Sequence, residues 1–103
     1  MRDISELVQL IKNRFESSGF AQVEGYYRFG FVRVTNVSII VLREKGTEAK
    51  IPLTKIGVAL TAVREDRAVY SNGPNSLRKY GVTHVNSPVW ALIHLLSLDE
   101  FVS

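Results

Sequence analysis

The sequence contains no cysteine, three prolines and a single tryptophan among its 103 residues. Without cysteine the chain has no disulfide, thiolate nucleophile, Cys-ligated zinc or iron–sulfur cluster. Proteins that lack disulfides are typical of reducing compartments, so we expect a cytoplasmic protein. The two histidines, His84 and His94, lie in no H-x-H or H-x-x-E pattern. We therefore expect no metal and no cofactor.

The sequence also lacks an apolar run long enough to cross a membrane. Its most apolar stretch, residues 88–98, would form a helix roughly 16 Å long at about 1.5 Å per residue, half of a bilayer core of about 30 Å. The charged residues near the N-terminus are not followed by the apolar run of a signal peptide. We expect neither a membrane span nor a signal peptide.

The composition is that of a folded chain, with 46% hydrophobic residues, 22% charged residues and a formal net charge of +3. Such a chain is too apolar and too weakly charged to be disordered. Two domains would need roughly 100 residues each. Residues 1–103 are therefore predicted to form a single compact domain.

The first element is predicted to be an amphipathic helix over residues 3–17. Apolar residues recur at i, i+3, i+4, i+7 and i+11 from Ile4, which places them on one helical stripe. Asp3 and Glu6 approximate a capping box at its start. Gly19 supplies a residue that can end the helix in a left-handed conformation.

The next part of the chain has the period of two that is typical of strands. Residues 26–35, 37–43 and 48–53 are rich in aromatic and β-branched residues. Their short connections, including a hairpin loop with Gly46, leave no room for a crossover helix. A three-stranded antiparallel meander is predicted.

Residues 54–64 fit either a helix or a strand. The alanines and Thr54 as a possible N-cap favour a helix, whereas Gly57 disfavours it. The same residues also show the apolar alternation of a strand. A helix is the preferred interpretation, and the strand stays open.

The C-terminal third is predicted to be mainly helical. Residues 67–71 are expected to form a short strand and residues 76–80 one helical turn. A last helix is expected to begin with a cap at Asn86 or Ser87 and to end near Leu98. The whole pattern predicts an α+β fold, with an N-terminal helix, an antiparallel sheet of about three or four strands and C-terminal helices packed on one face.

Positive charge is concentrated in the middle of the chain. Residues 26–83 hold ten basic and four acidic side chains, whereas the segments before and after them are net negative. Because positive charge alone suffices for contact with phosphate, we predict a small non-catalytic module that binds DNA, RNA or another polyanion through a basic sheet and hairpin region. Cations on an edge strand also prevent aggregation, which is the alternative interpretation. The candidate contacts are Arg28, Arg33, Arg43, Lys45, Lys50, Lys55, Arg78 and Lys79.

One strand of this region, residues 28–34, is similar to the RNP1 strand of RNA-recognition modules. In that pattern two aromatic side chains, here Phe29 and Phe31, stack on bases beside a basic residue. The segment lacks the glycine after the basic residue and the final aromatic, and only one helix precedes it, so no membership follows. The alternative is that Tyr27, Phe29 and Phe31 pack the sheet against the first helix. In a regular strand Arg28 and Arg33 would lie on opposite faces.

The last helix predicts a second function, self-association. Apolar residues cover nearly its whole circumference, and a helix of this kind must be buried on several sides. A small domain has little room for it, so a homodimer is predicted, unless the helix is the centre of a monomeric core. The candidate interface residues are Trp90, Ile93, Leu95 and Leu96.

Catalysis is the third and least favoured interpretation. Glu48-Ala49-Lys50, on the third predicted strand, is similar to the E-x-K of the restriction-type nuclease core, which would imply a minimal metal-dependent nuclease. That chemistry needs a second carboxylate upstream, and no aspartate occurs between Asp3 and Asp66. Serine, His84 and aspartate occur without the frame of a catalytic triad.

Overall fold

The computed structural model describes the backbone of residues 2–102 and the side chains of residues 2–100. Helix α1 (Ile4–Ser18) precedes a four-stranded antiparallel sheet of order β1-β2-β3-β4. The strands are β1 (Phe20–Ala21), β2 (Phe29–Val34), β3 (Ser38–Arg43) and β4 (Glu48–Pro52). They are followed by α2 (Leu53–Glu65), α3 (Ala68–Ser71), the 3-10 helix η1 (Pro74–Tyr80), α4 (Asn86–Ile93) and α5 (Leu98–Val102). The predicted α+β fold is confirmed.

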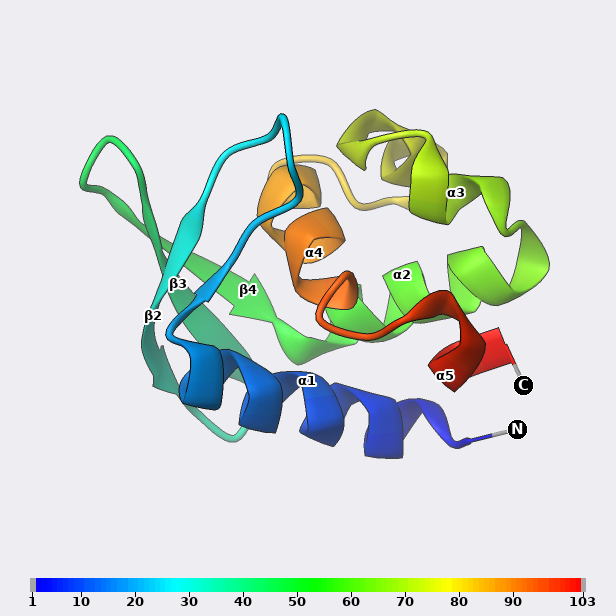
Figure 1. The fold of residues 1–103 in the computed structure, drawn as a ribbon, viewed down its shortest axis with the longest axis horizontal. Helices are drawn as coiled ribbons and strands as arrows, with labels where there is room; N and C mark the ends of the chain where they lie inside the picture. Colours follow the sequence, from blue (N-terminus) through cyan, green and yellow to red (C-terminus); the bar gives the residue numbers. More distant parts are fainter. Residues whose placement is uncertain (1, 103) are drawn as a thin grey trace.

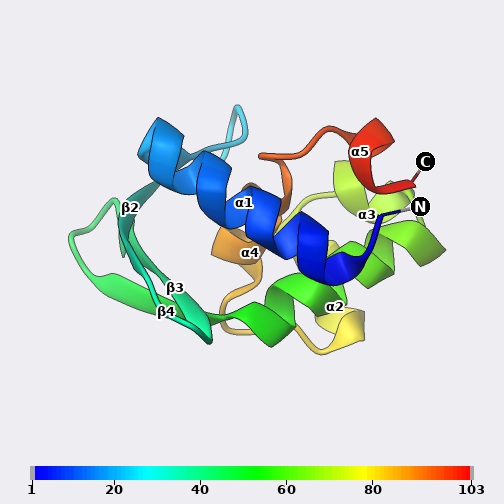
Figure 2. The same cartoon turned by 90° about the horizontal axis from the view of Figure 1, so that it is seen from below.

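The sheet and the C-terminal helices occupy opposite ends of the molecule, and α1 runs along both (Figure 1). Seen from below, α1 begins beside the helical end and reaches the sheet with its last turn (Figure 2). Accordingly, it contacts β1 and β2 as well as α2 and α4. All the described helices lie on one side of the sheet, so the other side, here called the outer face, is left uncovered (Figure 1).

Helix α1 forms as its periodicity predicts. Leu7, Ile11 and Phe15 are fully buried on one stripe. Gly19 ends the helix with a φ of 81°, and its N–H donates to the carbonyl of Phe15 at 2.8 Å. The expected capping box is wrong, because Asp3 stands at the N-cap without a side-chain hydrogen bond.

The inner face of the sheet packs on the core, and on β3 the outer-face residues Ser38 and Ile40 are buried as well. Phe29 and Phe31 of β2 point into the core, where the Phe31 ring meets the Phe15 ring edge-on at 5.3 Å between centroids. On β3, Ile39 and Val41 share this inner face. The alternation is interrupted in β2, where the register with β3 shifts between Phe31 and Arg33. The intervening Val32 is therefore the extra residue of a β-bulge.

Residues 54–64 fit either a helix or a strand in the sequence, and in the structure they lie within helix α2. The helix begins directly after Pro52, and Ile56, Leu60 and Val63 are fully buried. Pro52, not Thr54, is the N-cap. A proline fits this position because its fixed φ suits an extended residue just before a helix.

Three predictions about the C-terminal third are wrong. The last helix is expected to be capped by Asn86 or Ser87, but the N-cap of α4 is Val85, and Asn86 is already its first residue. Residues 67–71 were expected to form a strand, but the chain forms α3, because the Asp66 carboxylate accepts the N–H of Ala68 at 3.0 Å and starts a turn. The last helix was expected to continue to about Leu98, but α4 ends at Ile93. After it the chain tightens into turns, in which the N–H of Leu95 donates to the carbonyl of Leu92.

Helix α4 is the centre of the core. It contacts α1, α2, β1 and η1, and every residue from Pro88 to Ile93 is buried. The indole N–H of Trp90 donates to the carbonyl of Val69 at 2.9 Å, which ties α4 to α3. The apolar circumference of this helix is therefore covered within one subunit.

Candidate nucleic-acid interface

The β-bulge at Val32 brings two predicted contacts onto one face. Because β2 gains one residue there, Arg33 pairs with Ile40 of β3, and Ile40 pairs in turn with Lys50 of β4. Arg33 and Lys50 thus flank Ile40 in one row across the outer face, and both side chains are exposed. The expectation that Arg28 and Arg33 lie on opposite faces is wrong for this reason.

Arg28 lies on the same outer face, where its guanidinium group packs on an aromatic ring. Its guanidinium carbon lies 4.1 Å from the centre of the Phe20 ring, a cation–π distance. Phe20 pairs with Gly30, which pairs with Leu42 on its other side. Phe20 is 38% exposed and Leu42 is 42% exposed, so aromatic and apolar surface lies among the cations.

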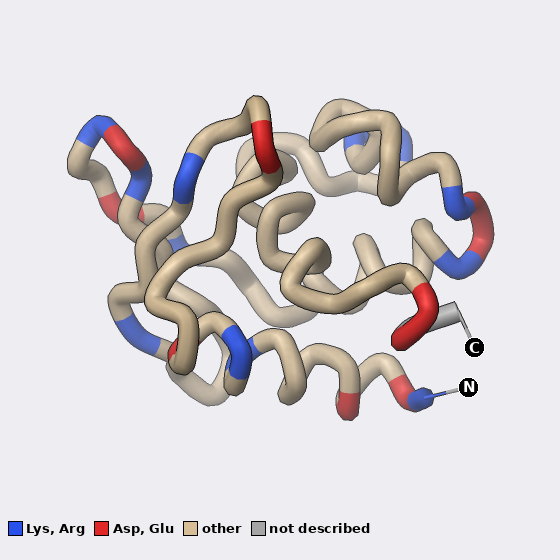
Figure 3. The backbone as a smooth tube through the Cα atoms, viewed as in Figure 1, with Lys and Arg blue, Asp and Glu red and all other residues tan. Residues whose placement is uncertain are grey.

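The charges of this face are mixed. Glu48 pairs with Leu42 and is exposed on the outer face near Lys50. The arginine and lysine positions spread over the sheet and hairpin, with acidic positions between them (Figure 3). The outer face is thus defined here by Phe20, Arg28, Arg33, Leu42, Glu48 and Lys50.

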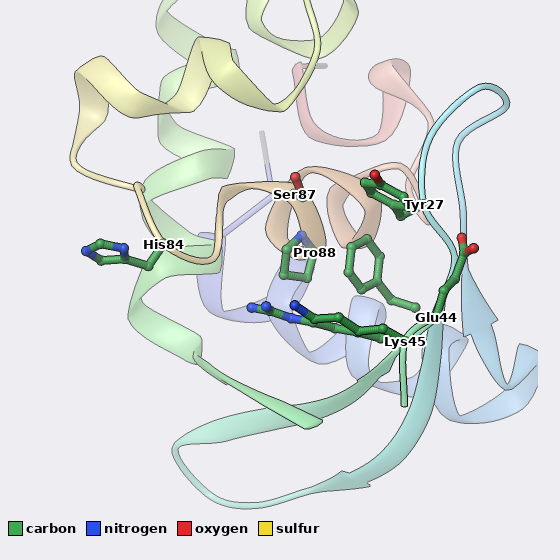
Figure 4. A pocket seen from close by; sticks show the side chains of 8 residues that line it. Tyr27, Glu44, Lys45, His84, Ser87 and Pro88 are labelled. Atoms are coloured by element: carbon green, nitrogen blue, oxygen red, sulfur yellow. The ribbon is translucent and has the colours of Figure 1, made fainter. Parts of the chain in front are cut away.

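Arg43 and Lys45 lie in a different place, a pocket between the β3–β4 hairpin and the start of α4. Arg43 pairs with Phe29 on the inner face of the sheet. In Figure 4, Lys45 extends beneath Pro88, whereas the His84 ring points away from the pocket. The pocket has a volume of about 390 Å³ and is lined by Tyr27, Phe29, Arg43, Glu44, Lys45, His84, Ser87 and Pro88.

The one carboxylate of this pocket is held by the neighbouring loop. The backbone N–H of Arg28 donates to Oε2 of Glu44 at 2.6 Å. The Nε–H of Arg43, by contrast, is buried and meets no acceptor among the described residues. A buried donor without a partner costs about 1–3 kcal/mol, whereas the half-buried Arg43 side chain as a whole lines the pocket with its positive charge.

Lys55, Arg78 and Lys79 are not brought to either surface. The Lys55 ammonium donates to the carbonyl of Gly81 at 3.1 Å. Arg78 donates to the side-chain oxygen of Asn75, and Lys79 lies 5.3 Å from the Tyr80 ring centre. These three cations therefore belong to the helical end of the molecule, around η1.

The aromatic residues of β2 do not form the base-stacking strand of an RNP1 pattern. Phe29 is only 4% exposed and Phe31 packs on α1, as the alternative interpretation held for both. That interpretation is wrong for Tyr27, which is 70% exposed. Tyr27 precedes β2 in a loop, where strand alternation gives no information about its direction.

The residues expected to mediate self-association lie in the core of the subunit itself. Trp90 is 3% exposed, Ile93 and Leu96 are fully buried, and Leu95 is half-buried. Dimerisation through Trp90, Ile93 or Leu96 would require these side chains to leave the core, and only Leu95 of the four keeps part of its surface exposed.

The histidines differ in environment. His84 is exposed. The ring nitrogens of His94 lie 2.7 Å from the carbonyl oxygen of Trp90 and 2.8 Å from that of Tyr70, and its ring stacks on Tyr70 at 3.9 Å. Burial lowers the pKa of His94, against the opposing effect of the two carbonyls. These contacts make His94 a structural bridge between α4 and α3.

The described residues contain no group of three or more His, Asp or Glu side chains placed to hold a metal ion. Glu48 and Lys50, the residues of the E-x-K pattern, lie on the exposed outer face of β4. Among the described residues, Glu48 therefore belongs to no such group of ligands.

Comparison with known proteins returns no relatives: no family model, curated protein or solved structure matches this chain. Among the helices of the described residues, none is long and apolar enough to traverse a bilayer.

Proposed function

We propose that this chain is a non-catalytic module that binds single-stranded nucleic acid across the outer face of its sheet. The observation that carries the proposal is that Arg28, Arg33 and Lys50 share the face that no described helix covers. Exposed Phe20 and Leu42 lie between them. A cytoplasmic location, which the lack of cysteine favours, is compatible with this role and stays a prediction.

The mixture of cations and apolar side chains favours a single strand over a duplex. In a single strand both the phosphates and the faces of the bases are available, and base–aromatic stacking contributes about 1–3 kcal/mol per base. Phe20 with Arg28 above it supplies such a stacking unit. A duplex would present only phosphates to this face, since its bases are already stacked.

The proposal is tested by fluorescence anisotropy with labelled single strands of about 12 nucleotides, since sites of this kind span roughly 4–16 nucleotides. Poly-dT and poly-U strands distinguish DNA from RNA, and a duplex of the same length is the third probe. We expect both single strands to bind more tightly than the duplex, with an affinity that falls as salt rises.

The matched variants each remove three positive charges. Arg28→Gln, Arg33→Gln and Lys50→Gln together should weaken binding by about tenfold or more at low salt. The control combines Arg67→Gln, Arg78→Gln and Lys79→Gln at the helical end, and should change affinity by less than about twofold. Equal losses in the two triple variants, or tighter binding of the duplex, would reject the outer face as a single-strand site.

A further inference from the structure

The pocket at the hairpin has the size and the lining of a ligand site and is separate from the outer face. Its volume of about 390 Å³ lies within the range of about 300–1,000 Å³ that is typical of small-molecule sites. Arg43 reaches it from the inner face of β3, opposite to the face that carries Arg33 and Lys50. A ligand here would therefore not compete directly for the outer-face cations.

The polar part of the pocket is suited to an anion. Lys45 extends along it, and the Nε–H of Arg43 is buried without an acceptor among the described residues. The Glu44 carboxylate is engaged by the N–H of Arg28. Arg43 and Lys45 both line the pocket, so a phosphate or carboxylate there would meet two cations that can donate charge-assisted hydrogen bonds.

The start of α4 adds positive electrostatic potential. Its first turn supplies Ser87 and Pro88 to the pocket lining, and its N-cap, Val85, forms no side-chain cap. Asn86 does not cap the helix either, since its amide donates to Pro74 and Asn75 at 3.2 and 3.3 Å. An uncapped helix start favours a negative group nearby.

The apolar part of the pocket is suited to a flat ring. The buried residues Phe29 and Pro88 line it, together with Tyr27, which is 70% exposed. Tyr27 and Glu44 also line a second hollow of about 510 Å³, with Gln22, Gly25 and Tyr26. The Tyr27 ring is thus accessible for stacking, and a planar heterocycle would cover it.

We propose that this pocket binds a nucleoside monophosphate, with the phosphate on Arg43 and Lys45 and the base against Tyr27 and Pro88. The ligand is either a free mononucleotide or the phosphorylated end of a strand. Binding of the free mononucleotide is independent of the proposed function, whereas binding of a strand end rests on it.

The inference is tested by NMR titration of the ¹⁵N-labelled chain with uridine 5′-monophosphate, uridine and inorganic phosphate as separate probes. The monophosphate should shift the amide signals of residues 27–29, 43–45 and 84–88. Uridine and inorganic phosphate should each bind at least about fivefold more weakly, because each offers only half of the contacts. Inorganic phosphate binding as tightly as the monophosphate, or signals that shift mainly elsewhere, would overturn the inference.

The variants replace exposed residues, so that a loss of binding does not result from a folding defect. Lys45→Gln and Tyr27→Ala should each weaken binding of the monophosphate by about threefold or more. The control, Arg33→Gln with Lys50→Gln, removes two cations from the outer face and should leave this affinity unchanged. A loss in the control as large as that in Lys45→Gln would contradict a specific pocket.

A strand carrying a 5′- or 3′-phosphate, compared with its hydroxyl form, separates the two sources of the ligand. If strand ends are recognised, one phosphorylated form binds more tightly to the wild type than the hydroxyl form does, and Lys45→Gln removes the difference. If the outer-face variants abolish strand binding but not mononucleotide binding, the two sites are distinct. Failure of strand binding with intact mononucleotide binding rejects the proposed function alone, and the reverse result rejects the pocket alone.

Discussion

Single residues decide which charges of this chain lie together. Arg33 reaches the outer face because Val32 is an extra residue in β2, and Arg43 is left in a pocket because it pairs with Phe29 on the inner face. Elsewhere a charge is used for packing: Arg14 makes a two-pronged contact with Glu100, each pair of atoms 2.7 Å apart, which fastens α5 to α1.

The Arg14–Glu100 pair should make stability depend on acidity. The Arg14 hydrogen bond, with help from the Ser97 N–H, lowers the pKa of Glu100 to about 2. The folded state favours the charged form of this carboxylate. The pair therefore contributes fully to the free energy of unfolding above the unfolded pKa of about 4.3, and this contribution is lost as the pH falls toward 2. Solvent screens the pair, so we expect about 1 kcal/mol or less.

Urea unfolding of the wild type and of Glu100→Gln between pH 2 and pH 7 measures this contribution. The difference in unfolding free energy between the two should be largest near pH 7 and should shrink below pH 4.3. Arg14→Gln is the matched control and should give the same pH trend. A difference that stays constant with pH would contradict the assigned role of Glu100.

Among the buried polar contacts, the hydrogen bond of Trp90 should contribute most to stability. Its indole N–H donates to the carbonyl of Val69, and Trp90→Phe leaves that carbonyl without this donor while removing ring volume. We expect a loss of about 2–4 kcal/mol in unfolding free energy, measured by urea titration. Tyr26→Phe, on the half-exposed ring packed 4.9 Å from Trp90, should change stability by less than about 1 kcal/mol. Similar losses in both variants would show that the indole N–H has no special role.

At the scale of elements, the sequence predicts what local patterns determine. The periodicity of α1, its end at Gly19 and the hairpin at Gly46 depend on neighbouring residues, and all three are confirmed. The β-bulge in β2 and the turn that replaces a strand at α3 depend on pairing and side-chain contacts that spacing does not reveal. For the same reason the charged residues of the candidate site were predictable one by one, but their division between two surfaces was not.

Replacing Gly19 or Gly57 with alanine should change the stability of the fold in opposite directions. Gly19 has a φ of 81°, so Gly19→Ala should destabilise the chain by about 1 kcal/mol through backbone strain alone, since nothing lies within 4 Å of an added methyl group. Gly57 lies inside α2, where an added methyl would meet only the Ile4 side chain at 3.4 Å. Gly57→Ala should therefore stabilise by up to about 1 kcal/mol. Thermal unfolding of both variants measures these changes in stability. Changes of the same sign would contradict the different backbone roles given to the two glycines.

At the scale of the whole molecule, the helices and the inner face of the sheet form the core, and the outer face of the sheet presents charge. Helix α4 sits inside the helical end and is covered on all sides, which accounts for its apolar circumference. The sheet keeps one face free of helices and carries the cations Arg28, Arg33 and Lys50 there. The proposed binding role rests on this difference between the two faces of the sheet.

The central claim is that these three cations contact phosphates of a single strand. For a single strand, the logarithm of affinity falls with the logarithm of salt concentration with a slope of about −0.7 per phosphate contacted. The most direct test is this slope, measured by anisotropy with the wild type and with the Arg28→Gln, Arg33→Gln, Lys50→Gln variant. We predict a slope shallower by about 2 in the variant, since three contacts are lost. An unchanged slope would contradict the account.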